Sequence, residues 1–154
     1  AKKFGGPERA TEILDHVTSV AAQDNITFNM DIAVRANTFL AHRLLSYALK
    51  QHGTAVQIPL KERIMDAYFT DGKNIGDIDV LADCAESAGI DRLEAHTFLS
   101  GDEFVDEVRS EIAEAAEYGV TAVPTFVING QWSVPGAQDV EMFERIIERI
   151  LEKA

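Results

Sequence analysis

Cysteine is nearly absent from this chain, which has Cys84 as its single thiol among 154 residues. One cysteine excludes an internal disulfide, a Cys-x-x-Cys redox pair and a cysteine-rich zinc site built from these residues alone. Positive charge is scarce too, with 14 Lys and Arg against 26 Asp and Glu and a formal net charge of −12. Such an acidic chain is poorly suited to phosphate backbones or anionic lipid, so neither nucleic acid nor a membrane is expected as a partner.

Long apolar runs are also missing. No segment reaches the ~18 consecutive apolar residues of a membrane span, and Lys2 and Lys3 are not followed by the apolar core of a signal peptide. The expected protein is therefore soluble and cytoplasmic. The absence of an initiator Met predicts a processed chain or a fragment. A hydrophobic content of 46% is nevertheless enough to build a core.

Apolar residues recur at helical spacing over most of the chain. In the first such segment Ile13, Val17 and Val20 form one stripe after Pro7, a residue suited to a first helical turn. Pro59 is likewise expected in the first turn of a helix. The pattern predicts helices over about 7–23, 38–52, 59–70, 78–88, 91–99, 102–118 and from 139 onward, and a strand-like or extended segment over 25–31.

The pattern changes only after Gly119. Residues 125–128 are rich in strand-forming side chains, Asn129-Gly130 is a favoured two-residue hairpin turn, and 131–134 provides the return strand. An isolated two-stranded hairpin is marginal in water, so the sheet looks incomplete. The expected structure is mostly helical with one C-terminal β-hairpin.

Val123-Pro124 lies at the entry to the first of these strands. Proline cannot donate to a strand ladder, and the residue before it is driven to extended geometry, so the dipeptide predicts a bend. By itself such a bond is expected to be trans, although a cis bond also fits a bend of this kind.

The segment from Gly119 to Gly130, followed by Val-Pro-Gly-Ala-Gln and an amphipathic helix, resembles the C-terminal end of DsbA-like thioredoxin-fold proteins, closest to the FrnE group of dithiol-disulfide oxidoreductases. Earlier segments around Ala41-His42-Arg43-Leu44 and Ala67-Tyr68-Phe69 resemble the helical domain inserted in that group. The resemblance implies an α/β thioredoxin-like fold of the DsbA type with an incomplete sheet. Residues 1–118 correspond to the inserted helical domain and 119–154 to the ββα end.

The resemblance also implies a function and a site. The family places its Cys-x-x-Cys before the inserted helices, so no catalytic residue is expected within this chain. The chain is expected to be part of a longer disulfide oxidoreductase or isomerase and to be inactive by itself. A cis Val123-Pro124 bond beside the thiolate implies substrate binding by Val123, Pro124 and Thr125. Asn37 and His42 are further candidates on the helical domain. Protein thiols or disulfides are the implied partners, with glutathione as another candidate, and no cofactor is expected.

Two alternatives stay open. The helical segments also resemble kappa-class glutathione transferases and 2-hydroxychromene-2-carboxylate isomerases, which would use an upstream serine. The other alternative is a non-catalytic helical module that binds a partner. Because the outer edge of strand 125–128 lacks the neighbour that the fold would supply, a homodimer or a swapped assembly through this edge is also predicted.

Other chemistry-bearing residues have structural explanations. Cys84 and Ser87 imitate a Cys-x-x-Ser motif but lie within a predicted helix among acidic residues, which should raise the pKa of the thiol; Cys84 is interpreted as a buried bystander. Trp132 is interpreted as a packing residue of the hairpin. No metal is expected, because the histidines lack the spacing of metal ligands and are scattered as His16, His42, His52 and His96.

Overall fold

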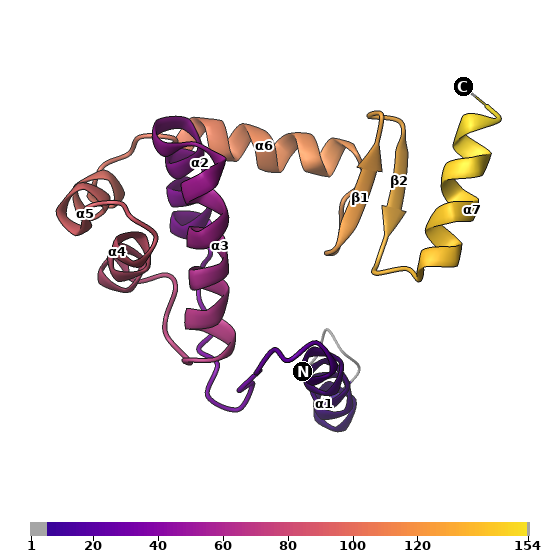
Figure 1. Cartoon of the computed structure of the whole chain (residues 1–154), viewed down its shortest axis with the longest axis horizontal. Coiled ribbons are helices and arrows are strands. Elements are labelled where there is room, and N and C mark those ends of the chain that lie inside the picture. Colours follow the sequence, from indigo (N-terminus) through magenta and orange to yellow (C-terminus); the bar gives the residue numbers. More distant parts are fainter. Residues whose placement is uncertain (1–5, 154) are drawn as a thin grey trace. The chain divides into compact units, whose positions relative to one another are not determined.

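The computed structural model describes residues 6–153, which divide into two compact units at the boundary between Val108 and Arg109. The elements appear in chain order in Figure 1 as α1 (Pro7–Gln23), α2 (Phe39–His52), α3 (Thr54–Phe69), α4 (Ile78–Ser87), α5 (Arg92–Ser100), α6 (Val105–Glu117), β1 (Thr125–Ile128), β2 (Trp132–Pro135) and α7 (Val140–Leu151). The boundary between the units falls within α6. The division at residue 118 that the family resemblance implies stays a prediction.

The core of the first unit lies among α2, α3, α4 and α5. Figure 1 shows α2 beside α3 and α4 beside α5, and each of these helices contributes buried side chains to the core. Leu44, Leu60 and Leu81, from three different helices, are completely buried. Burial of a leucine contributes about 1.5–3 kcal/mol, so contacts among the helices stabilise them more than local helix propensity does.

The start of α3 corrects the sequence prediction. Pro59 was expected in the first turn, but α3 begins at Thr54 and Pro59 lies inside it. Gly53 explains the difference: with φ of +80° it separates α2 from α3 by one residue, so the chain returns to helix at once. An interior proline costs an isolated helix about 3 kcal/mol or more. Here the buried side chains of Leu60 and Ile64 anchor the helix beyond it.

The alternating segment 25–31 is an irregular turn rather than a strand. The Asn29 backbone N–H donates to the Phe69 carbonyl at 2.7 Å, and the Asn29 side-chain amide donates to the Thr70 carbonyl at 2.7 Å. Phe28 stacks on Phe69 with ring centroids 4.4 Å apart. These contacts satisfy the carbonyl groups left open where α3 ends. The alternation therefore reflects contact with a helix end instead of sheet pairing.

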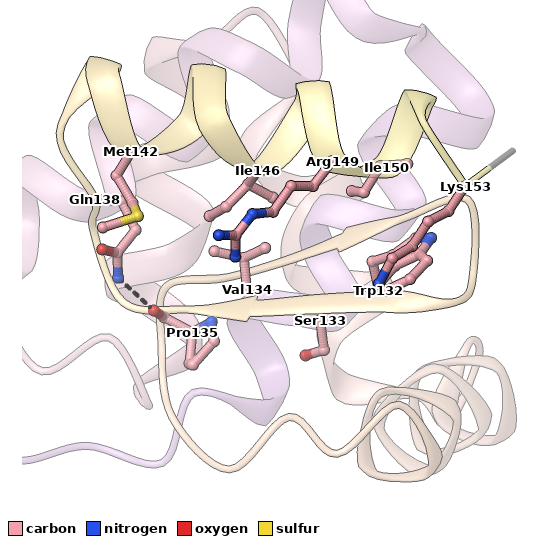
Figure 2. A pocket seen from close by; sticks show the side chains of 10 residues that line it. All are labelled: Trp132, Ser133, Val134, Pro135, Gln138, Met142, Ile146, Arg149, Ile150 and Lys153. Carbon is pink, nitrogen blue, oxygen red and sulfur yellow. Dashed lines mark hydrogen bonds between the residues drawn. The ribbon is translucent and has the colours of Figure 1, made fainter.

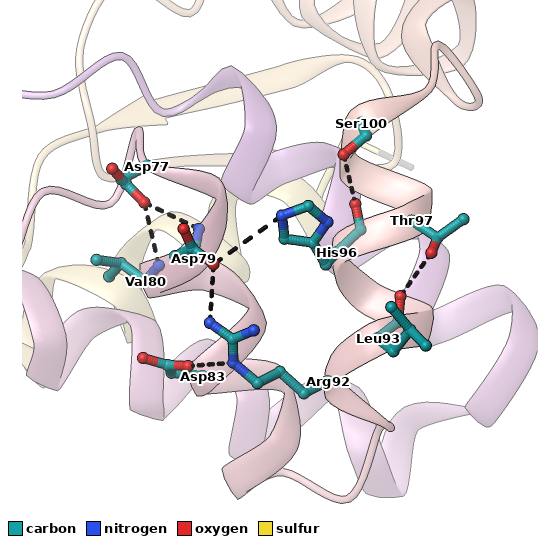
Figure 3. A network of polar contacts seen from close by, with 9 residues as sticks. All are labelled: Asp77, Asp79, Val80, Asp83, Arg92, Leu93, His96, Thr97 and Ser100. Carbon is teal, nitrogen blue, oxygen red and sulfur yellow. Dashed lines mark hydrogen bonds and ion pairs between the residues drawn. The ribbon is translucent and has the colours of Figure 1, made fainter.

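A polar network joins α4 to α5 (Figure 3). Arg92 donates from Nε to Asp83 at 2.7 Å and from a terminal nitrogen to Asp79 at 2.8 Å. His96 Nε2 lies 3.9 Å from the same Asp79 carboxylate. Asp77 caps α4 by accepting from the backbone N–H of Asp79 and Val80. The network orients the two helices relative to each other. It contributes little net stability, because its charges are exposed to solvent.

The second unit contains the hairpin and α7. β1 and β2 pair antiparallel, with Phe126 opposite Val134 and Ile128 opposite Trp132. Paired residues of an antiparallel sheet share a face, so these four side chains lie on one side of the hairpin. Phe143 of α7 meets Phe126 edge to face at 4.9 Å between ring centroids, which places α7 against that side. The predicted hairpin and final helix are both present, and β2 lies one residue later than the predicted strand over 131–134, beginning at Trp132 and ending at Pro135.

Candidate functional site

The loop between α6 and β1 carries the predicted substrate-binding residues. Gly119, with φ of +74°, ends the preceding helix: its N–H donates to the Ala116 carbonyl and the Val120 N–H donates to the Ala115 carbonyl. This is the Schellman arrangement, which closes a helix and turns the chain away from its axis. The peptide bond between Val123 and Pro124 is cis, the isomer implied by the family resemblance.

Two hydrogen bonds hold this loop against the hairpin. The Thr125 hydroxyl donates to the Ala122 carbonyl at 2.7 Å. The Gly136 N–H donates to the Pro124 carbonyl at 2.8 Å, linking the end of β2 to the start of β1. The Thr125 hydroxyl therefore already has a hydrogen-bond partner within the loop, and its bond to the Ala122 carbonyl fixes its position.

Val123 is the most exposed large apolar residue of the described chain, at 89% of its free surface. Within residues 6–153 its backbone N–H and C=O have no hydrogen-bond partner. Pro124 next to it has no N–H to donate. Val123 thus presents one backbone donor and one backbone acceptor immediately before the unpaired outer edge that β1 has in the described sheet.

Asn37 and His42 belong to the first unit. The Asn37 side chain accepts a hydrogen bond from the Phe39 N–H at 2.9 Å, so it has a local role at the start of α2. His42 is exposed on α2. Their assignment to a substrate site stays a prediction.

Arg43, next to His42, was not identified from the sequence as a residue with a role of its own. It is only 3% exposed, and it donates from Nε to the Glu103 carbonyl and from a terminal nitrogen to the Gly101 carbonyl, both at 2.8 Å. A longer bond of 3.4 Å reaches the Phe98 carbonyl, and the guanidinium lies 5.2 Å from the Phe98 ring centroid. Arg43 therefore holds the C-terminal end of α5 against α2, which is a structural task.

Cys84 is buried in the middle of α4. Burial raises the pKa of its thiol above the ordinary value, and the nearby cations Arg63 and Lys73 act in the opposite direction. The sequence predicted a raised pKa from acidic neighbours; Asp83 and Asp71 do contribute, but desolvation is the larger cause. A buried, protonated thiol is a poor nucleophile, so this position lacks the features of a redox site.

Tyr47, His52 and Glu94 form a polar cluster that the sequence did not reveal. The Tyr47 hydroxyl donates to Glu94 Oε1 at 2.6 Å, and His52 Nε2 lies 2.9 Å from the same oxygen. Burial and the Glu94 carboxylate raise the pKa of Tyr47 to about 12. Glu94 comes from α5 and the other two from α2, so the cluster joins these helices. No sequence signal marks it, because the partners are more than 40 residues apart.

A pocket of about 450 Å³ lies between β2 and α7 in the second unit. Figure 2 shows the Arg149 side chain extending from α7 toward β2, with Ile146 and Val134 beside it. At the other end, the Lys153 ammonium lies 5.3 Å from the centroid of the Trp132 ring. The lining is predominantly apolar and contains no acidic side chain.

Two searches for other kinds of site gave negative results for the described residues. Across positions 6–153, His, Cys, Asp and Glu side chains form no group of three that could hold a metal ion. No described helix combines the length and apolar character needed to cross a membrane.

A hairpin backed by a C-terminal helix, with a proline loop at the strand entry and a separate helical unit, is the architecture of DsbA-like thioredoxin-fold proteins. The chain belongs to the family of DSBA-like thioredoxin domains, whose sequence profile matches residues 2–148.

Solved structures support the fold. A probable DsbA oxidoreductase from Streptomyces coelicolor superposes with a TM-score of 0.84 at 28% identity, over 99% of this chain and 65% of that one. A Nitrosomonas europaea protein, proposed to be a protein disulfide isomerase, superposes with a TM-score of 0.71 at 20% identity, over 96% of this chain and 76% of that one. The second similarity shows the fold alone.

A curated relative adds a sequence match. The uncharacterized protein YwbO of Bacillus subtilis strain 168 is 38% identical over 86 residues, which cover 55% of this chain and 42% of that protein. The chain thus spans less than two thirds of the length of both YwbO and the Streptomyces protein.

Proposed function

We propose that this chain is part of a thiol-disulfide oxidoreductase or isomerase whose redox-active cysteines lie outside residues 1–154. The observation that carries the proposal is the exposed Val123 backbone at the entry to β1, in a DSBA-like thioredoxin domain. The only thiol within the chain, Cys84, is buried and has a raised pKa, which argues against it as the reactive group.

The proposed reaction is exchange between a thiolate and a substrate disulfide. The thiolate attacks one substrate sulfur and forms a mixed disulfide, the other substrate sulfur leaves as a thiolate, and a second cysteine of the enzyme then resolves the mixed disulfide. The enzyme dithiol becomes a disulfide and the substrate is reduced; oxidation of a substrate dithiol is the reverse sequence. Both steps need the substrate backbone to be held still beside the reactive sulfur.

In this proposal Val123 holds the substrate. Its free N–H and C=O pair with an extended substrate segment, as an added strand pairs with a sheet edge. Pro124 contributes by having no N–H that would compete for a substrate carbonyl. Thr125 fixes the loop through its bond to Ala122. Asn37 and His42 are proposed as secondary contacts from the helical unit. The substrates are protein thiols and disulfides, with glutathione as a small alternative.

The test compares the 154-residue chain with the protein expressed from the complete reading frame that encodes it. We expect the product of the complete frame to reduce insulin with dithiothreitol, and the 154-residue chain to be inactive. Val123→Pro, which removes the N–H, should lower kcat/KM at least about tenfold. One hydrogen bond between neutral groups contributes about 0.5–1.5 kcal/mol, and misplacement of the substrate beside the reactive sulfur adds to the loss. Val123→Ala, which keeps the N–H, is the matched control and should retain most activity.

Two outcomes would contradict the proposal. One is catalytic turnover by the 154-residue chain that disappears in Cys84→Ser. The other is an inactive product of the complete frame with both insulin and glutathione disulfide as substrates. Activity that strictly requires glutathione and conjugates it to an organic electrophile would instead support the kappa-class alternative.

A further inference from the structure

The pocket between β2 and α7 combines an apolar lining with two cations, Arg149 beside Val134 and Ile146 and Lys153 at the end bordered by Trp132. Val134, Ile146 and Ile150 supply aliphatic surface, and the Trp132 ring borders one end. Arg149 and Lys153 are the only charged residues in the lining. Its volume, about 450 Å³, is within the range of about 300–1,000 Å³ that is typical of small-molecule sites.

The two cations have no carboxylate partner in the described structure. Within residues 6–153, no ion pair joins Arg149 or Lys153 to an acidic side chain at 4.0 Å or less. This is notable in a chain of net charge −12, where carboxylates outnumber cations. Glu148 of α7 and Glu152, which follows the helix, do not line the pocket. An anionic group in the pocket would therefore meet positive charge and no acidic side chain in the lining.

We infer that this pocket binds an amphipathic carboxylate, a small molecule with an alkyl body and one carboxylate group. The alkyl body lies along the aliphatic surface of Val134, Ile146 and Ile150, where it loses contact with water. The carboxylate binds at the Arg149 guanidinium, and Lys153 lies further along the pocket, at the Trp132 end. The Arg149 guanidinium is suited to two parallel hydrogen bonds with a carboxylate, and Lys153 adds a second charge. This site requires no redox step and goes beyond the proposed function.

An alternative explanation is that both cations serve the helix alone. Positive side chains are favourable near a helix C-terminus because they oppose the partial negative charge of its carbonyl groups. Lys153 also gains from lying over the Trp132 ring. These effects predict changes in helix stability after substitution but no selective affinity for a carboxylate, so a binding measurement separates the two explanations.

Trp132 is the only tryptophan of the chain, so its fluorescence reports on this pocket without labelling. The experiment titrates the 154-residue protein with octanoate and, separately, with octylammonium, which has the same tail and the opposite charge, both below micelle-forming concentrations. We expect octanoate to shift the Trp132 emission in a saturable manner. We expect octylammonium to bind at least about tenfold more weakly.

The variants assign the charge effect to the pocket. Arg149→Gln combined with Lys153→Gln should weaken octanoate binding at least about tenfold, the fold-change expected for the loss of a charge-assisted contact. The single variant Arg149→Lys, which keeps a positive charge at that position, should bind octanoate more tightly than the double variant does. Arg145→Gln is the matched control, because it removes one positive charge from the same helix outside the pocket and should leave binding unchanged. Far-ultraviolet circular dichroism checks that each variant is folded.

Three results would overturn the inference. The first is an equal response to octanoate and octylammonium, which would indicate unselective partitioning. The second is undiminished octanoate binding by the double variant. The third is the absence of saturable octanoate binding at every concentration below micelle formation.

Discussion

Replacing Arg43 with methionine should destabilise the first unit by about 3–4 kcal/mol, although the residue has no proposed part in chemistry. Methionine keeps much of the buried stem but removes all donors. The two short bonds, to the Glu103 and Gly101 carbonyls at 2.8 Å, come from a charged donor and contribute about 1.5 kcal/mol each. The contact with the Phe98 ring adds about 0.5–1 kcal/mol.

The size of this effect depends on burial, which gives the experiment its control. Arg63 also makes a 2.8 Å bond, to Asp71, but both side chains of that pair are one third exposed. Arg63→Met should therefore cost less than about 1 kcal/mol. Arg43→Lys should fall between the two, since an ammonium keeps the charge but lacks the planar fork that reaches two carbonyls.

Urea unfolding followed by far-ultraviolet circular dichroism measures the total loss, and amide hydrogen exchange locates it. Exchange should accelerate in α2 and α5, which Arg43 joins, and remain nearly unchanged in β1 and β2. If Arg43→Met lost no more stability than Arg63→Met, the assignment of Arg43 as a buried link between helices would be refuted.

Three further predictions concern the same chain. Tyr47→Phe should lower the free energy of unfolding at neutral pH. The folded pKa of Tyr47 is raised to about 12, so the stability that the tyrosine contributes is complete below about pH 10 and is lost as the pH rises toward 12. The difference in stability between the two proteins should therefore shrink in that range. A constant difference from neutral to alkaline pH would contradict this. The Cys84 thiol should react with an aromatic disulfide reagent at least about tenfold more slowly in the native chain than in urea, and equal rates would mean that it is accessible. The outer edge of β1 should pair with a second copy; light scattering should then show self-association that Val127→Lys reduces, whereas a uniform monomer with rapid exchange along both hairpin edges would refute the pairing.

Much of the local structure could be predicted because it depends on residues close together in the sequence. The stripe in residues 7–23 predicted α1 with its observed bounds, and Asn129-Gly130 identified the hairpin turn between β1 and β2. The loop at Val123-Pro124 was found through its resemblance to a family, since a short proline bend by itself favours no particular site. Pro59 was misplaced, because the chain returns to helix directly after Gly53 and the packing that tolerates an interior proline, through Leu60 and Ile64, is tertiary.

The sequence by itself thus determined the helices, the hairpin and the family, all of which follow from periodicity, turn chemistry and a contiguous motif. Only the tertiary structure decided which side chains meet. Arg43 bonds to carbonyls 58 and 60 residues further along the chain, and Tyr47 bonds to Glu94 across the interface of two helices. The pocket beside Trp132 exists because α7 returns over β2 and brings Arg149 to its lining. Such contacts depend on packing between elements, and no local pattern encodes the partner of a residue that lies tens of positions away.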